Sequence, residues 1–179
     1  MRIKTLFAAF AAGLLAACSM EKAVSEHAAA PGDGWTMQVL GEETNQVFMV
    51  TGPDGKRAAA RVTGGESVMV ADAEAQTLFA DAQTALSRDP PDEKVSIQAP
   101  GVSIKVSADE DATGEAERGR VRIAVGGISI DVDGDEGSGD GRGTVRIAGV
   151  NAEAAHKFID EAEDLSPEVK RQMREKLGL

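Results

Sequence analysis

The sequence predicts an α+β fold in which antiparallel β-hairpins form a meander, with one central helix and a C-terminal helical hairpin. Three observations lead to this prediction. Apolar and polar residues alternate over short segments between residues 35 and 150, Gly-containing turns separate these segments, and helical spacing is confined to about 73–87 and the region after 151. A β-solenoid with a helical cap is the alternative, but the reversal of apolar parity at the Gly turns of the second part favours hairpins.

For residues 34–90, the first part of the domain, the sequence predicts a strand meander and a helix. Two turn signals divide the strands, Gly52-Pro53-Asp54-Gly55 and Gly64-Gly65-Glu66. A turn centred on 53–54 and a three-residue loop at 64–66 would create four apolar cross-strand pairs: Met49 with Ala58, Val47 with Ala60, Val62 with Val68, and Ala60 with Val70. We then expect Asp72 to cap a helix over 73–87, which Pro90-Pro91 ends.

The second part, residues 91–150, carries the clearest pattern in the chain. Folding at Pro100-Gly101 predicts these apolar pairs: Ala99 with Val102, Ile97 with Ile104, and Val95 with Val106. The same design recurs around Gly126-Gly127 with these pairs: Val125 with Ile128, Ile123 with Ile130, and Val121 with Val132. On the other face Arg122 should lie opposite Asp131. A further strand is expected over 144–150.

The last part, residues 151–179, predicts a helical hairpin. Asn151 should cap a helix over 152–164, and Ser166-Pro167-Glu168 should start another. Apolar stripes mark the core side of these helices: Ala155, Phe158, Ile159 and Ala162, then Val169, Met173 and Leu177. The cations of the second helix, Lys170, Arg171, Arg174 and Lys176, are expected to meet the acids Glu161, Glu163 and Asp164.

The first 17 residues have the features of an export signal. Arg2 and Lys4 precede an uncharged apolar run over 6–17, which is shorter than a membrane-spanning helix requires. Leu15-Ala16-Ala17-Cys18 resembles the lipobox of bacterial lipoprotein precursors. The resemblance covers the leader only, and it implies acylation of Cys18, cleavage in front of it, and attachment to a membrane through the lipid. Ser19, in place of an Asp at that position, favours the outer membrane, facing the periplasm, over the inner membrane.

The mature chain that would remain is acidic and poor in aromatic residues. Residues 18–33 form a polar, Ala-rich segment, which we interpret as a flexible tether before the domain over 34–179. Removal of the leader removes two cations, so the net charge changes from −11 to −13. Such an excess of acid argues against nucleic acid as a partner, because that binding requires cations that neutralise phosphates.

Two acidic segments suggest a cation site as an alternative function. Asp131, Asp133 and Asp135, followed by Glu136, alternate in the manner of a calcium loop, and residues 109–111 occupy the matching place in the first hairpin. A calcium loop of this type needs Gly at the position of Glu136 and a bidentate Glu at the position of Arg142. The departures favour solvated acidic loops, so we expect no metal site and no cofactor.

The sequence contains no catalytic motif that we can assign. His156 lies one helical turn before Asp160, which is a common surface pair, and no nucleophile-elbow spacing accompanies it. We therefore expect a lipid-anchored, non-catalytic protein of the cell envelope that binds another envelope protein or a wall component. The alternative is a calcium-responsive module that uses the acidic hairpin loops.

Overall fold

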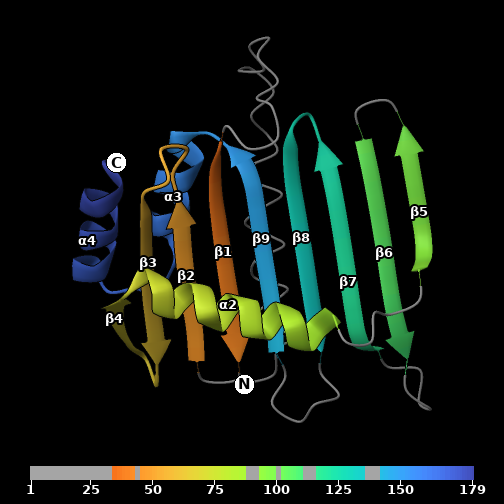
Figure 1. Ribbon diagram of the computed structural model, residues 1–179, viewed down its shortest axis with the longest axis horizontal. Coiled ribbons are helices and arrows are strands. Elements are labelled where there is room, and N and C mark those ends of the chain that lie inside the picture. The colour runs from red at the N-terminus through yellow and green to blue at the C-terminus, as the bar shows by residue number, and fades with distance from the viewer. Residues whose placement is uncertain (1–33, 43–44, 88–92, 100–101, 111–115, 136–141) are drawn as a thin grey trace.

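The computed structural model describes residues 34–42, 45–87, 93–99, 102–110, 116–135 and 142–179, which form an α+β domain (Figure 1). The strands are β1 (Trp35–Glu42), β2 (Asn45–Thr51), β3 (Arg57–Thr63), β4 (Glu66–Val70), β5 (Glu93–Ala99), β6 (Val102–Glu110), β7 (Ala116–Val125), β8 (Ile128–Asp135) and β9 (Arg142–Val150). The helices are α2 (Asp72–Ser87), α3 (Ala152–Glu161) and α4 (Pro167–Leu177).

Within the described ranges, all nine strands belong to one antiparallel sheet with the order β4-β3-β2-β1-β9-β8-β7-β6-β5. Every neighbouring pair except β1 and β9 is also consecutive in the chain. The β1–β9 pairing therefore joins two meanders, which we call the first half (β1–β4) and the second half (β5–β9). The alternative prediction of a β-solenoid is wrong, because antiparallel hairpins form this sheet whereas a β-helix stacks parallel strands.

Helices cover both faces of the first half. On one face α2 packs Ala75, Phe79 and Ala82 against a cluster that includes Val47 and Met49 of β2. On the other face α3 and α4 pack on a second cluster, whose members are Met37, Val39, Phe48, Val50, Ala58, Ala60, Val62 and Ile147 from the sheet and Ala155, Ile159, Leu165, Val169, Met173 and Leu177 from the helical hairpin and its connection. Figure 1 shows α2 crossing the sheet from β4 towards β7 on the side opposite to α3 and α4.

The two predicted registers in the first half are wrong by one residue. Met49 pairs with Ala59, because the β2–β3 loop comprises five residues, 52–56, instead of a two-residue turn. This loop closes through a hydrogen bond in which the Gly52 amide donates to the Lys56 carbonyl at 2.8 Å. The four observed pairs that replace the predicted ones are Met49 with Ala59, Phe48 with Ala60, Val62 with Ser67, and Ala60 with Met69.

The second error comes from the glycines of the β3–β4 turn. Thr63 pairs with Glu66, so Gly64 and Gly65 alone form the turn. Both glycines have positive φ, 58° and 86°, as a two-residue type I′ turn requires. A one-residue change in register moves side chains to the other face. The strands β2 and β3 carry apolar residues on both faces because their apolar residues are consecutive, Val47 to Val50 in β2 and Ala58 to Ala60 in β3, and a helix covers each face.

The hairpin registers predicted for the second half are confirmed. In the β5–β6 hairpin, Val95 pairs with Val106, Ile97 with Ile104 and Ala99 with Val102. In β7–β8 it pairs Val121 with Val132, Ile123 with Ile130 and Val125 with Ile128, and it places Arg122 opposite Asp131. Gly126 and Gly127 have φ of 57° and 86°, as the two-residue turn requires.

The start signals of the last two helices are confirmed. The Asn151 side chain accepts a hydrogen bond from the Ala154 amide at 2.9 Å, and Ser166 accepts one from the Val169 amide at 3.4 Å. Helix α3 ends at Glu161, three residues earlier than predicted, and Ala162 has an extended ψ of 92°. Asp72, predicted as a cap, is instead the first residue of α2.

The predicted ion pairs between the last two helices are wrong. Because α3 ends at Glu161, the acids 163 and 164 lie in the connection, and the cations of α4 find other partners. Arg174 pairs with Asp160, and the Lys170 ammonium donates to the Asp160 carbonyl at 2.7 Å. Arg171 pairs with Glu168 and Glu175, and Lys176 pairs with Asp72 of α2. The last pair ties the C-terminal helix to the helix on the other face.

Candidate functional site

The predicted lipidation site, Cys18, lies outside the described residues, as do Asp111 and Glu136 of the predicted acidic loops. The other candidate residues fall mainly on the second half of the sheet. This half has an apolar face on the side of α3 and α4 and a charged face on the side of α2. Each face is built by the hairpin registers.

Two register rows of apolar residues run across the sheet, and their described side chains form the apolar face. One row carries isoleucine at five successive strands: Ile147, Ile130, Ile123, Ile104 and Ile97. The next row carries valine at five successive strands: Val145, Val132, Val121, Val106 and Val95. Both rows continue into the core of the first half, because Ile147 pairs with Met37 and Val145 pairs with Val39.

The helical hairpin covers only one end of these rows. Helices α3 and α4 make their main sheet contacts with β1, β3 and β4. Ile147 in β9 is 5% exposed, whereas Val125 and Ile128, at the β7–β8 turn, are 45% and 40% exposed. We define the open apolar face as the described apolar side chains of β6–β8 beyond the helix-covered core, of which two are exposed, Val125 and Ile128, and four are half-buried, Val106, Val121, Ile123 and Val132.

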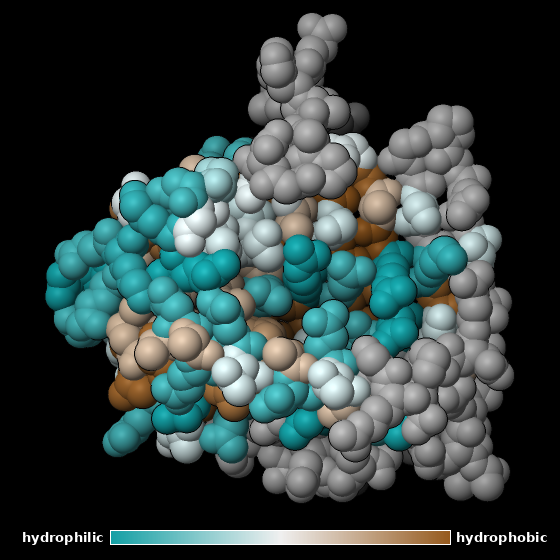
Figure 2. Space-filling view, viewed as in Figure 1, coloured by the Kyte–Doolittle hydropathy of each residue, from teal (hydrophilic) through white to brown (hydrophobic). Residues whose placement is uncertain are grey.

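The opposite face of β7 and β8 carries a ladder of cross-strand ion pairs. Arg118 pairs with Asp135 at 3.3 Å, and Arg122 approaches Asp131 at 3.6 Å. Arg120 pairs with Asp133 between them, and its guanidinium also donates to the Leu86 carbonyl of α2 at 3.4 Å. Figure 2, which views the molecule from the α2 side, shows hydrophilic side chains over these strands.

The central pair of the ladder is the least exposed. The side chains of Arg120 and Asp133 are 14% and 17% exposed, whereas that of Arg122 is 52% exposed. Removal of one partner from an ion pair that water reaches poorly costs more stability than the same change in an exposed pair, because the remaining charge is poorly hydrated. This central pair therefore stabilises, beneath the end of α2, the register of β7 against β8 that the Gly126-Gly127 turn sets.

The ladder changes the interpretation of the second acidic segment. Asp131, Asp133 and Asp135 lie within β8, whereas the sequence predicted an acidic loop that closes the hairpin. Alternation along a strand directs the three carboxylates to one face, where each meets an arginine. Among the residues whose side chains are described, no cluster of three or more His, Cys, Asp and Glu residues could hold a metal ion.

One contact of this face could not be predicted from the sequence. Asp131 also approaches Arg146 of β9 at 3.7 Å, so that two arginines share one carboxylate. The pairing of β8 with β9 creates this contact, and residues 136–141 separate these strands in the chain. By contrast, the pairs of Arg118 and Arg120 follow directly from the predicted opposition of Arg122 and Asp131, because residues two apart share a face.

The predicted surface pair of His156 and Asp160 is confirmed on α3. His156 Nδ1 lies 3.0 Å from the Asp160 carboxylate, which also pairs with Arg174. A hollow of about 560 Å³ borders this pair, lined by Ala152, Glu153, His156, Lys157, Asp160, Glu161 and Leu179. The lining residues include no Ser, Thr or Cys that could serve as a nucleophile beside the histidine.

The resolved shifts in pKa occur at exposed ion pairs away from both faces. Hydrogen bonds from Arg171 and Gln172 lower the pKa of Glu168 below its ordinary value of 4.5. A hydrogen bond from Lys56 lowers the pKa of Asp54 below its ordinary value of 3.8. Both shifts favour the charged carboxylate, as is usual for structural ion pairs.

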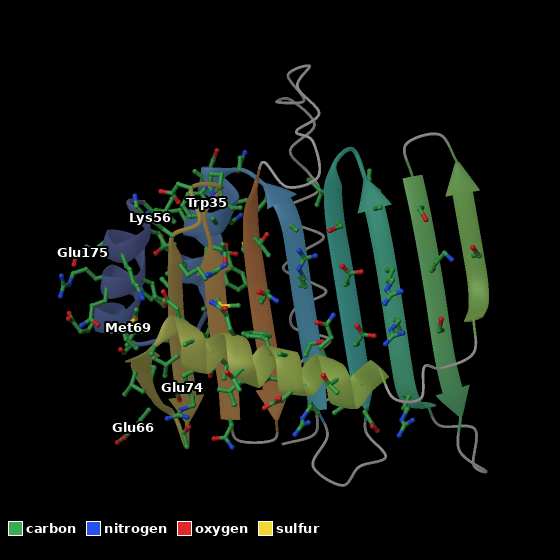
Figure 3. All side chains as sticks on the ribbon, viewed as in Figure 1. Trp35, Lys56, Glu66, Met69, Glu74 and Glu175 are labelled. Atoms are coloured by element: carbon green, nitrogen blue, oxygen red, sulfur yellow. The ribbon has the colours of Figure 1, made fainter. Side chains whose placement is uncertain are left out.

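A further exposed pair anchors α2 on the first half. Arg61 of β3 donates a hydrogen bond to Glu74 of α2 at 3.0 Å, and Figure 3 shows Glu74 near the end of β3. Met69, also labelled there, belongs to β4 and packs against the core beneath the helical hairpin. These contacts concern the covered half of the sheet and leave the open apolar face as the main candidate site.

Comparisons with protein-family models, with curated proteins and with solved structures found no match for this chain. Among the described residues, no helix is both long enough and apolar enough to cross a membrane.

Proposed function

We propose that this protein is a lipid-anchored, non-catalytic binding protein of the bacterial cell envelope. Acyl chains on Cys18 would hold it in a membrane, and the open apolar face would bind a protein partner. Two independent features support the two parts of the proposal: the lipobox-like Leu15-Ala16-Ala17-Cys18 supports the anchor, and the uncovered half of the sheet supports the binding role.

The observation that carries the binding role is the continuation of the apolar rows beyond the helices. The same rows that form the core under α3 and α4 reach Ile123 and Val121 of β7. Large contiguous apolar surfaces are rare on monomeric soluble proteins and usually mark interaction sites. A face of β-branched side chains without a charge fits a protein surface better than it fits a polar wall polymer.

The polar groups of the described region support a binding role over a catalytic one. Its fully buried side chains are all hydrophobic. The carboxylates of β8 face arginines, and the Asp160 carboxylate beside His156 is held by Arg174. A general acid or base at neutral pH usually needs a carboxylate or histidine whose pKa is shifted by burial in a cleft.

The location follows from the leader. Lipid attachment with two or three chains would hold the protein firmly, since each buried CH₂ contributes about 0.8 kcal/mol. Ser19 favours the outer membrane. The tether over 18–33 would place the domain in the periplasm close to that membrane, where envelope proteins are the available partners.

The anchor is tested by the substitution Cys18→Ser in cells that express the full chain. We expect loss of labelling by radioactive palmitate and loss of the protein from the membrane fraction. Ser19→Asp is the matched control, since it should keep the lipid and move the protein towards the inner membrane. Membrane retention of an unlabelled Cys18→Ser chain would refute the anchor.

The binding face is tested by the reactivity of a new thiol in intact cells. Ile128→Cys lies on the open apolar face, and Val68→Cys provides a control at a Val that is 51% exposed on β4. We expect a maleimide reagent to label Val68→Cys in cells and in purified protein, and to label Ile128→Cys only in purified, diluted protein. Equal labelling of both thiols in cells would show that nothing occupies the face.

A further inference from the structure

We propose that the charged face of the sheet binds a phosphate monoester through Arg122 of β7 and Arg146 of β9. This site lies on the side of α2, opposite to the open apolar face, and the inference is independent of the binding role proposed for that face. It depends on the charges that the strand register brings together, on the distances between them and on their exposure.

The register places an excess of positive charge in one row of the charged face. The row crosses successive strands from β5 to β1 and consists of Ser96, Lys105, Arg122, Asp131, Arg146 and Gln38. We call it the cationic row, because it contains three cations and one carboxylate in a chain whose net charge is −11. In the neighbouring row beneath the end of α2, by contrast, one arginine, Arg120, faces one aspartate, Asp133.

The cationic row includes a repulsion that the fold does not require. Lys105 lies directly opposite Arg122 in the register of β6 and β7. Like charges at directly opposite positions of an antiparallel pair destabilise the sheet. A polar residue without charge, such as Ser96 or Gln38 at the two ends of the row, would avoid this cost. A bound anion would offset the repulsion.

The two arginines hold their shared carboxylate loosely. Arg122 Nε lies 3.6 Å from Asp131 Oδ1, and Arg146 Nη1 lies 3.7 Å from Asp131 Oδ2. A guanidinium that donates a hydrogen bond to a carboxylate usually lies at ~2.7–2.9 Å, and Arg61 donates to Glu74 at 3.0 Å. Within the described part of the chain, the ion pairs of Arg122 and Arg146 are those with Asp131. Their N–H donors are therefore available to a further acceptor.

One anion can reach both arginines. Both guanidiniums lie within 3.7 Å of the two oxygens of one carboxylate, so their N–H groups flank the same position above β8. The side chains of Arg122 and Arg146 are 52% and 47% exposed, and that of Asp131 is 33% exposed. The donors are thus open to solvent on the face that Figure 2 views. The strands β7 and β9 have neighbours on both sides in the sheet, which keeps the two backbone positions rigid.

Charge and shape favour a phosphate monoester as the ligand. This group carries a charge of about −1.5 to −2 at pH 7 and offers three acceptor oxygens. Its charge balances the excess of the cationic row, whereas a single carboxylate would balance only half of it. Guanidinium groups bind phosphate oxygens with paired N–H donors. A lipid headgroup and a soluble phosphorylated compound can both present this chemistry.

The inference is tested by protection of the arginines from phenylglyoxal, which modifies accessible guanidiniums. The full chain is anchored in phosphatidylcholine vesicles in a buffer without phosphate, and mass spectrometry of its peptides gives the rate at each arginine. We expect saturating methyl phosphate to slow modification of Arg122 and Arg146 severalfold and to leave Arg171 unchanged. Arg171 is a matched internal control, because its side chain is 51% exposed on α4. Dimethyl phosphate, with a single charge, should protect much less.

Two variants separate a site from general attraction between charges. Arg146→Gln should raise the methyl phosphate concentration that half-protects Arg122 by about tenfold, since one of the two guanidiniums is lost. Its thermal melting should match that of the parent because Arg146 is 47% exposed. Arg171→Gln removes the same charge far from the cationic row and should leave that concentration unchanged. Equal effects of the two variants, or no protection of Arg122 in the parent, would overturn the inference.

The source of the phosphate is distinguished by the composition of the vesicles. Phosphatidic acid presents a phosphate monoester, whereas phosphatidylglycerol, added to equal surface charge, presents a phosphate diester. If phosphatidic acid alone protects Arg122 and Arg146 without methyl phosphate, the ligand is a lipid headgroup. If neither lipid protects them and methyl phosphate does, the ligand is a soluble phosphorylated compound. Failure of every monoester to protect these arginines would overturn the site and leave the proposed role of the open apolar face standing.

Discussion

Truncation of a valine should cost much more on the covered half of the sheet than on the open half. Val50 of β2 and Val125 of β7 belong to the same face, but Val50 is 0% exposed beneath the helical hairpin and Val125 is 45% exposed. The comparison of Val50→Ala with Val125→Ala therefore keeps the residue type, the strand conformation and the sheet face constant. The main difference between the two positions is the cover, and Val125 is also the last residue of β7.

The expected magnitudes follow from burial. Val→Ala removes two carbons, which is worth about 1.6 kcal/mol of transfer free energy at ~0.8 kcal/mol per CH₂. At Val50 a closed cavity adds to this loss, so we expect the free energy of unfolding to fall by about 2–3 kcal/mol. At Val125 about half of the side chain already meets water and no closed cavity forms, so the loss should stay below about 1 kcal/mol.

Urea denaturation of the purified protein measures both values. Trp35 is the only tryptophan and packs against the core beneath α3 and α4, so its fluorescence should report unfolding of the domain. Equal losses at the two positions would refute the conclusion that the helices cover only one end of the apolar rows.

Three further substitutions test local features of the structure. Gly149→Ala should destabilise the domain by more than about 2 kcal/mol, because Gly149 has a φ of 83° and an added Cβ would lie 2.2 Å from the Gly127 carbonyl oxygen; thermal melting measures the loss. Arg120→Ala should cost about 3 kcal/mol in urea denaturation, because it leaves the Asp133 carboxylate poorly hydrated without its partner. Glu168→Gln should lower the free energy of unfolding at pH 7. A carboxylate with a lowered pKa stabilises the fold above its unfolded pKa of about 4.5, and it loses this contribution as the pH falls through the folded pKa. The effect of the substitution should therefore disappear below the lowered pKa of Glu168.

Each of these substitutions has a control or an outcome that contradicts it. Gly55→Ala also places a side chain at positive φ, but nothing lies within 4 Å of the added Cβ, so its cost should be about 1–2 kcal/mol. Arg122→Ala removes an arginine that is 52% exposed and should cost less than about 1 kcal/mol. Equal costs within either matched pair would contradict the structure. For Glu168→Gln, a difference from the parent that does not shrink as the pH is lowered from 7 through 4.5 and below would show that the ion pair with Arg171 is not its source.

The sequence predicted the hairpins of the second half correctly because their turns leave one choice of register. A two-residue turn between segments of opposite parity aligns Val125 with Ile128, and each further pair follows by counting residues away from the turn along the two strands. In the first half the turn sequence allowed loops of different lengths. Gly52-Pro53-Asp54-Gly55 fits a two-residue turn and a five-residue loop alike, and the apolar residues on both faces of β2 gave no preferred parity.

The joining of the two halves could not be predicted. The pairing of β1 with β9 connects residues about 100 positions apart, and alternation along a strand does not identify its neighbour. The position of Arg146 beside Asp131 depends on the register of β8 against β9, and no two-residue turn fixes this register because residues 136–141 separate the two strands. The Arg120–Asp133 pair was accessible to sequence reasoning, because it follows from the hairpin register that placed Arg122 opposite Asp131.

The apolar pattern of the second half also raises the question of what covers the apolar face. Alternation shows that one face of each strand is selected to avoid water, but it does not identify what covers that face. In the first half α3 and α4 supply the cover, and Val50 is fully buried. Val121 and Ile123 of β7 occupy the same rows beyond the helices. This face is apolar in sequence and only half-buried beyond α3 and α4, and the proposed binding role would account for the pattern by a partner that covers it.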